Sequence, residues 1–286
     1  MPNILLITTD QQRRDSLGCY GNPVCRTPNL DTLASGGLRF TECYVNNPLC
    51  MPNRSTLLTG RHVNAHRVRT NGRSLDPREV TFPQLLGQAG YRTGAFGKMH
   101  FTSVQPADPP PDYPRADWWE YADECAREGF FGFDEVAVGA FHGGGGRSHV
   151  AQWQKQEHPD TYHLCRREHA LATSPHDTPE AWHSAQPVEA HPNRFVTEKT
   201  IDFIRRNADE SFFCWASYPD PHHPYNPPEP YCTMYDPAQV MLGPRLEGEL
   251  DNKPPHVREQ VDGKIKTGGT AQRPTFTEEQ LREVFA

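Results

Sequence analysis

Residues 48–60 read PLCMPNRSTLLTG, and this stretch places Cys50 at the expected beginning of a helix. Pro52 suits the first helical turn and Gly60 suits the position just beyond the helix end. Unpaired backbone N–H groups and a partial positive charge at a helix N-terminus favour a bound anion. Arg54, on the first turn, could add a fork of donors to an oxyanion. The stretch therefore predicts an anion site around Cys50.

Short apolar runs of β-type composition lie on both sides of this predicted helix. They cover residues 4–8, 38–45, 91–96 and 212–218, with a further run at 133–138. Helical signals alternate with them at residues 28–34, 83–89 and 195–206. Strands that alternate with helices predict an α/β fold in which helices sandwich a mostly parallel sheet.

Polar side chains follow four of these runs. In open α/β sheets, ligands bind beyond the carboxyl ends of the strands, so these side chains are expected to share one rim. Taken singly, each could instead be a buried thiol, a turn cap or a solvated loop residue. Their coincidence favours a site made of one carboxylate, one amide, one sulfur, one amine and two imidazoles: Asp10, Gln11, Cys50, Lys98, His100 and His222.

Residues 102–192 break the alternating pattern, because proline, histidine and glycine dominate there. Eight histidines recur at positions 142, 149, 158, 163, 169, 176, 183 and 191. Prolines between them prevent a single helix from gathering the histidines on one face. We interpret the segment as a loop-rich insertion, and its histidines as a polar loop layer rather than a metal cluster.

Composition narrows the class of protein further. The net charge is −7, the pI is near 6.0, and no run of basic residues occurs, which argues against nucleic-acid binding. An anionic substrate would need local positive groups or a metal ion. A leader peptide and a segment of membrane-spanning length are both missing from the sequence, so we expect no membrane association and a cytoplasmic location. Oligomeric state cannot be read from it.

The pattern Cys50-x-Pro52-x-Arg54, continued by Leu-Leu-Thr-Gly at 57–60, resembles the signature of the type I sulfatases of the alkaline-phosphatase-like superfamily. Residues 3–31, 90–100 and 220–222 agree with the same family in order, and the resemblance extends from residue 3 to about 231. It is weak inside the insertion. Met51 and Asn53 depart from the usual signature. Gln11 replaces a second aspartate, as in choline-sulfatase-like and phosphonate monoester hydrolase branches.

The resemblance implies that a formylglycine-generating enzyme converts Cys50 into formylglycine. Asp10, Gln11 and an oxygen of modified residue 50 would bind a divalent cation, calcium or alternatively magnesium or manganese. The substrate would be a small-molecule or saccharide sulfate ester.

The resemblance also implies roles for the remaining side chains. Lys98 would hold a sulfate oxygen, Arg54 would fix the deprotonated hydroxyl, and His100 would assist its deprotonation. His222 would protonate or hydrogen-bond the leaving oxygen, with His223 as the adjacent alternative.

The family's downstream metal ligands and second lysine have no counterpart before the end of the sequence, where residues 277–282 read as a capped helix start. We therefore interpret residues 1–286 as the N-terminal part of a sulfatase catalytic domain, truncated before its C-terminal part. Two alternatives stay open at this stage. One is a phosphonate monoester or phosphodiester hydrolase of the same superfamily, and the other is an inactive remnant.

Overall fold

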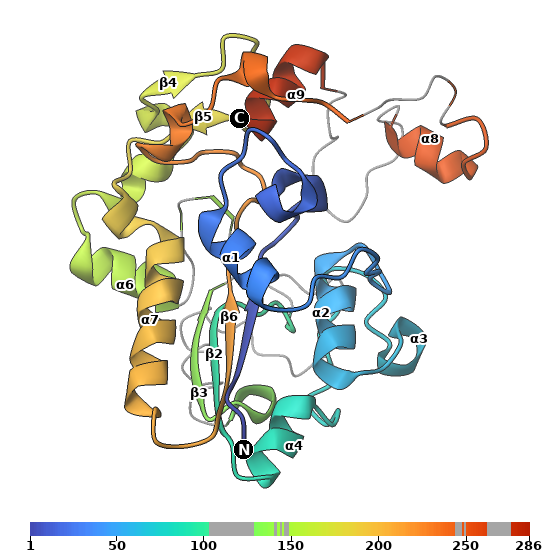
Figure 1. Ribbon diagram of the computed structural model, residues 1–286, viewed down its shortest axis with the longest axis vertical. Coiled ribbons are helices and arrows are strands. Elements are labelled where there is room, and N and C mark those ends of the chain that lie inside the picture. Colours follow the sequence, from blue (N-terminus) through green and yellow to red (C-terminus); the bar gives the residue numbers. More distant parts are fainter. Residues whose placement is uncertain are drawn as a thin grey trace, which may run out of the picture.

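A four-stranded parallel sheet forms the centre of the computed structural model (Figure 1). The structure describes residues 1–102, 129–139, 142–143, 145, 149–243, 248, 250–261 and 276–286, so much of the predicted insertion lies outside the described residues. The strand order is β1-β6-β2-β3. The strands are β1 (Ile4–Thr8), β2 (Arg92–Lys98), β3 (Glu135–Gly139) and β6 (Phe212–Ser217).

Helices cover both faces of this sheet. On one face lie α6 (His149–Glu157) and α7 (Pro192–Arg206), and on the other lie α2 (Cys50–Thr59) and α4 (Phe82–Gln88) (Figure 1). Every residue of β6 is buried, and its alternating side chains enter the two cores in turn. A strand buried on both faces is typical of a parallel sheet between helices, so the predicted fold class is confirmed.

The predicted helices form close to their expected positions. The run at 28–34 lies in α1 (Pro28–Gly36), the run at 83–89 overlaps α4, and the run at 195–206 lies in α7. Thr81 begins α4 with a capping box that includes Gln84. Thr277 caps α9 (Glu278–Phe285) in the same way.

The remaining elements are short. They are α3 (Val63–His66), α8 (Pro255–Val261) and an antiparallel pair, β4 (Ala172–Thr173) with β5 (Trp182–His183), together with several 3-10 turns. In the part of the chain that the structure describes, every helix is too short or too polar to cross a membrane.

The strand predicted at residues 38–45 does not form. This segment is irregular, and its large apolar side chains are exposed, including Leu38 at 91% and Tyr44 at 85%. Strand propensity is only realised against a neighbouring strand, and no described strand lies beside this segment. Cys50 therefore follows an irregular stretch rather than a strand end. β1 forms one edge of the described sheet, and Leu5 and Ile7 are 45% and 51% exposed there.

Candidate active site

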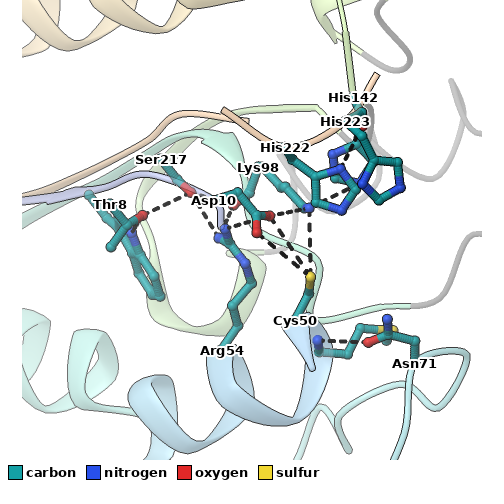
Figure 2. Close-up of polar contacts among 12 residues, drawn as sticks. Thr8, Asp10, Cys50, Arg54, Asn71, Lys98, His142, Ser217, His222 and His223 are labelled. Atoms are coloured by element: carbon teal, nitrogen blue, oxygen red, sulfur yellow. Dashed lines mark hydrogen bonds and ion pairs between the residues drawn. The ribbon is translucent and has the colours of Figure 1, made fainter. Parts of the chain in front are cut away.

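Five predicted side chains meet at the carboxyl edge of the sheet (Figure 2). The Cys50 sulfur lies 3.8 and 3.9 Å from the two carboxylate oxygens of Asp10 and 3.9 Å from Lys98 Nζ. Lys98 Nζ donates to Asp10 Oδ2, and Arg54 Nη2 lies 3.4 Å from the same oxygen. The His222 ring lies beside the end of the Lys98 side chain (Figure 2). These residues are separated by up to 212 positions in sequence and come from four segments.

The backbone explains how these segments reach one point. Asp10 lies two residues beyond β1, Lys98 is the last residue of β2, and Cys50 is the first residue of α2. β1 and β2 both pair in parallel with β6, so their carboxyl ends lie together. The N–H of Asp10 donates to the carbonyl of Asp220 at 3.1 Å, which joins the end of β1 to the turn that carries His222.

A second link holds that turn from the other side. Asn193 Nδ2, in the first turn of α7, donates to Asp220 Oδ2 at 2.8 Å, and His191 Nε2 lies 3.7 Å from the same oxygen. Burial raises the pKa of the Asp220 carboxyl, against the opposing effect of His191 and Asn193. The turn is thus attached both to β1 and to α7, which positions His222.

Arg54 is buried beneath the site, at 6% exposure. Its Nη1 donates to Ser217 Oγ at 2.8 Å and to the backbone carbonyl of Lys98. Ser217 Oγ also donates to the Lys98 carbonyl at 2.6 Å and receives a hydrogen bond from Thr8 Oγ1 at 3.0 Å. The last residues of β1, β2 and β6 therefore fix the guanidinium. Ser217 and Thr8 were not predicted, although both are polar residues at the ends of predicted strands.

The cluster contains one excess positive charge. Burial alone would raise the pKa of Asp10, but the cations Lys98 and Arg54 outweigh it and hold that pKa below its usual value, so the side chain is a carboxylate. Burial lowers the pKa of the Lys98 amine, while Asp10 opposes this effect. A guanidinium keeps its proton in proteins. Two cations against one carboxylate make the site suited to an anion.

Cys50 does not have the properties of a thiolate nucleophile. Burial raises the pKa of its thiol, and the Asp10 carboxylate adds to this rise, against the opposing charges of Lys98 and Arg54. A reactive thiolate requires the opposite shift. One backbone N–H at the N-terminus of α2 is also already hydrogen-bonded: the N–H of Met51 donates to Asn71 Oδ1 at 3.0 Å. An unmodified Cys50 would stay protonated at neutral pH.

His222 is buried, at 8% exposure, and its ring lies beside that of His223. Its Nδ1 lies 2.6 Å from the backbone carbonyl of His223 and must donate to it, which leaves Nε2 as the second functional nitrogen. Burial, with the charge of Lys98, lowers the pKa of His222 to about 4. His223 Nε2 lies 3.9 Å from Glu180.

His100 and Gln11 share an unusual backbone conformation. Their φ angles are +56° and +62°, a region that non-glycine residues rarely adopt and that often marks functional sites. Burial, with the charges of Lys98 and Arg54, lowers the pKa of His100 to about 3, and its buried Nδ1 has no hydrogen-bond partner among the described residues. Gln11 is exposed. Among the residues that the structure describes, none makes a contact with its side chain that identifies Gln11 as a ligand.

The donor chemistry fits a hard divalent cation only in part. The buried Asp10 carboxylate is an oxygen ligand of the kind that calcium and magnesium prefer, and an oxygen on residue 50 would lie beside it. Within the described part of the chain, no three His, Cys, Asp or Glu side chains gather in a group that could hold a metal. The described residues would therefore supply only one side of such a metal shell.

One residue of the site was missed by the sequence analysis. His142 Nε2 lies 3.1 Å from Lys98 Nζ, and its ring stacks on that of His222 with the centroids 3.4 Å apart (Figure 2). This histidine was interpreted only as part of a polar loop layer, and its contacts with Lys98 and His222 show that it also lies at the site. The sequence did contain a feature that could have identified His142: it lies three residues beyond the end of β3, just as other site residues lie shortly after a strand.

The buried histidines make stability depend on pH. The pKa values of His100 and His222 lie near 3 and 4 when folded, below the ordinary 6.5. Between pH 6.5 and 4 the unfolded chain binds protons that the folded chain does not, so stability falls as pH falls. We expect about 2 kcal/mol lost per histidine at pH 5, measured by denaturant unfolding at pH 7.5 and 5. His100→Gln should reduce the difference in unfolding free energy between the two pH values, whereas exposed His256→Gln should leave it unchanged. Equal stability of the wild-type chain at both pH values would contradict the lowered pKa values of His100 and His222.

A family model described as "Sulfatase" matches residues 2–245. Among curated proteins, the chain is 28% identical over 262 residues to the uncharacterized sulfatase YidJ of Escherichia coli, covering 90% of this chain and 46% of that protein. It is 30% identical over 260 residues to an arylsulfatase of Clostridium perfringens, covering 88% and 49%. The chain thus spans about half the length of these relatives.

Solved structures agree on the fold. A phosphonate monoester hydrolase of Agrobacterium radiobacter superposes with a TM-score of 0.66 at 24% identity, covering 99% of this chain and 55% of that one. The structure of a putative sulfatase from Bacteroides fragilis gives 0.59 at 21% identity, covering 99% and 54%. At these identities the likeness concerns the fold alone.

Proposed function

This chain belongs to the sulfatase family, and from that premise we propose that it hydrolyses sulfate esters with a formylglycine made from Cys50. The observation that carries the proposal is the meeting of Cys50 with Asp10, Arg54 and Lys98 in one buried cluster that has an excess positive charge. A sulfate monoester is an anion of the kind that such a cluster can bind. The substrate class proposed is a small-molecule or saccharide sulfate ester.

The chemistry of Cys50 supports modification rather than thiolate catalysis. Its raised pKa leaves the thiol protonated, and the nearby Asp10 carboxylate disfavours a second negative charge. A formylglycine-generating enzyme, as partner and with dioxygen as the oxidant, would convert this side chain to an aldehyde with loss of its sulfur, which removes the need for a thiolate. The hydrated aldehyde has two hydroxyls. One would lose its proton and attack sulfur, which breaks the bond between sulfur and the ester oxygen and releases the alcohol. The other would later lose its proton, expelling sulfate and restoring the aldehyde, to which water then adds again.

The other side chains have roles that follow from their positions. Lys98, with Nζ 3.9 Å from Cys50 Sγ, would bind a sulfate oxygen. Arg54, anchored under residue 50, would stabilise the deprotonated hydroxyl. His100, kept neutral by burial, would accept the hydroxyl proton during sulfate release. His222 would use Nε2 to donate a hydrogen bond or a proton to the leaving oxygen, for which bound anionic substrate must raise its low pKa.

A divalent cation, calcium or alternatively magnesium or manganese, would be held by Asp10, Gln11 and an oxygen of modified residue 50. When bound it would lower the pKa of the attacking hydroxyl and neutralise sulfate oxygens. Lys98 now pairs with Asp10, so this amine would be free to turn toward sulfate once the carboxylate has a metal partner.

Removal of the metal gives a direct prediction. We expect chelation with EDTA to lower turnover of an aryl sulfate at least tenfold, because the attacking hydroxyl would keep its ordinary high pKa and Lys98 would stay paired with Asp10 instead of binding a sulfate oxygen. Added calcium, magnesium or manganese should restore turnover to different extents and so identify the ion. Unchanged turnover after exhaustive chelation would exclude the metal from the proposal.

Peptide mass spectrometry across residue 50 tests the nucleophile. After co-expression with a formylglycine-generating enzyme, the peptide should lose the mass that corresponds to conversion of thiol to aldehyde. An unaltered thiol in an active preparation would overturn the formylglycine mechanism. The 286-residue chain should be assayed in parallel with calcium, because sustained multiple turnover would contradict the alternative that it is an inactive remnant.

Phosphonate monoester or phosphodiester hydrolysis is the neighbouring possibility. Gln11 keeps it open, since this residue replaces the second aspartate of many arylsulfatases, a variation that resembles the phosphonate monoester hydrolase branch. Turnover of an aryl sulfate and of an aryl phosphonate monoester by one preparation separates the two activities. Cleavage of the phosphonate monoester but not of the sulfate ester would assign the chain to phosphonate hydrolysis instead of sulfate ester hydrolysis.

A further inference from the structure

His142 makes two contacts within the site that none of the proposed roles uses. β3 ends at Gly139, which pairs with Lys98 in the sheet, so the chain that leaves β3 passes beside the end of β2. This places His142 Nε2 3.1 Å from Lys98 Nζ. The same ring lies nearly parallel to that of His222, at an interplanar angle of 16°. One imidazole therefore contacts both the amine and the imidazole that the proposed reaction needs.

The contact with Lys98 fixes which nitrogen of His142 carries the proton. An ammonium group only donates, so Nε2 must accept and the proton of a neutral ring must lie on Nδ1. Burial, with the charge of Lys98, lowers the pKa of His142 well below its ordinary value, which keeps the ring neutral. Asp10 and His142 then take two of the three Lys98 protons. The third is left for the side of Cys50, 3.9 Å away.

Tight packing of the backbone holds His142 in place. Gly143, next in the chain, has a φ of +66°, and a Cβ atom there would lie 2.7 Å from Pro224 Cγ and 2.8 Å from Asn226 Oδ1. Only glycine allows so close an approach. The residues that it packs against lie one and three positions beyond His223 in the chain, so the two stacked rings of His142 and His222 are attached to segments that contact each other.

We propose that His142 is a positioning residue for sulfate ester hydrolysis at this site: it orients the Lys98 ammonium toward residue 50 and fixes the plane of the His222 ring. The inference rests on the proposed function. Its physical basis is that donors aimed in advance at the reacting group need no reorganisation during the reaction. A displacement of about 1 Å in such a group can lower the rate about 100-fold.

Two substitutions of His142 remove its contact with Lys98 and its stacking on His222 one at a time. His142→Phe keeps a stacking ring but removes the acceptor for Lys98, and His142→Gln keeps an acceptor oxygen but removes the stack. With an aryl sulfate, we expect either change to lower kcat about tenfold or more with KM changed less than threefold, and His142→Gln to move the limb of the pH profile that reports His222. Exposed His256→Gln on α8 is the matched control. A tenfold loss of kcat in either His142 variant supports the positioning role of His142. If both variants keep kcat within twofold of wild type and the pH profile is unchanged, the positioning role is overturned.

A measurement that does not depend on turnover distinguishes failure of the His142 inference from failure of the proposed function. In wild-type chain labelled with ¹⁵N-histidine, NMR at pH 7.5 should find His142 as the Nδ1–H tautomer, with its carbon-bound ring protons shifted upfield by the neighbouring ring. An Nε2–H tautomer would overturn the inference even if the enzyme is active. If wild type hydrolyses no sulfate ester while the Nδ1–H tautomer is found, the proposed function fails and the contact between His142 and Lys98 stands.

Discussion

Cys50→Ala is expected to abolish sulfate ester hydrolysis, with kcat/KM falling about 10⁴-fold or more, since loss of a nucleophile removes the covalent step entirely. The substitution takes away one small side chain whose sulfur contacts Asp10 and Lys98 only at 3.8–3.9 Å. The fold should therefore survive. Initial rates with an aryl sulfate, together with the circular dichroism spectrum and the unfolding midpoint, measure both effects.

Cys43→Ala is the matched control for that substitution, because Cys43 is a free, exposed cysteine only seven residues away. It should leave turnover unchanged. Turnover of Cys50→Ala within tenfold of wild type would mean that another group attacks sulfur. Loss of turnover in both variants would point to a disturbance of the irregular segment 38–49 rather than of the nucleophile.

Arg54→Met should destabilise the fold and remove activity together. The guanidinium is buried and donates to Ser217, to the Lys98 carbonyl and to Asp10. Removing one member of a buried ionic cluster leaves polar partners unsatisfied, which costs about 3–5 kcal/mol. Loss of its stabilising charge should lower kcat about 10²- to 10³-fold. Denaturant unfolding and initial rates measure the two losses separately.

Arg78, on the surface, is the matched control for Arg54. Arg78 makes a similar pair with Asp76, at 2.7 Å, but its side chain is 88% exposed. Water screens such a pair, so Arg78→Met should change neither the unfolding midpoint nor turnover appreciably. Equal effects of Arg54→Met and Arg78→Met would show that the buried cluster has no special electrostatic role. Arg54→Lys should also fail, because an ammonium cannot reach all three acceptors with the geometry of a planar fork.

The two predictions test different properties of one cluster. Cys50 is surrounded by charges but contributes little to holding them together, whereas Arg54 links the ends of three strands. A large loss of activity without loss of stability is therefore expected for the first, and loss of both for the second. This difference follows from burial and hydrogen bonding alone, so it holds whichever anion proves to be the substrate.

The sequence by itself determined the fold class and selected most of the side chains that the structure brings together at the carboxyl edge of the sheet. Apolar runs separated by helical signals were enough to predict a parallel sheet between helices, since residue period and chain breakers are local properties. The rule that ligands bind at strand ends then selected Asp10, Lys98 and His222, which the structure brings together. Cys50 was correctly placed at a helix N-terminus because Pro52 and Gly60 mark the two helix ends.

Only the tertiary structure decided the remaining features. Residues 38–45 have strand composition yet stay irregular, because a strand requires a partner that local sequence cannot supply. His142 resembles the other histidines of its segment, and only the pairing of Lys98 with Gly139 brings it to the site. Ser217 and the raised pKa of Cys50 likewise depend on burial and on charges far away in sequence. Such properties arise from contacts between segments, and a pattern read along one segment does not contain them.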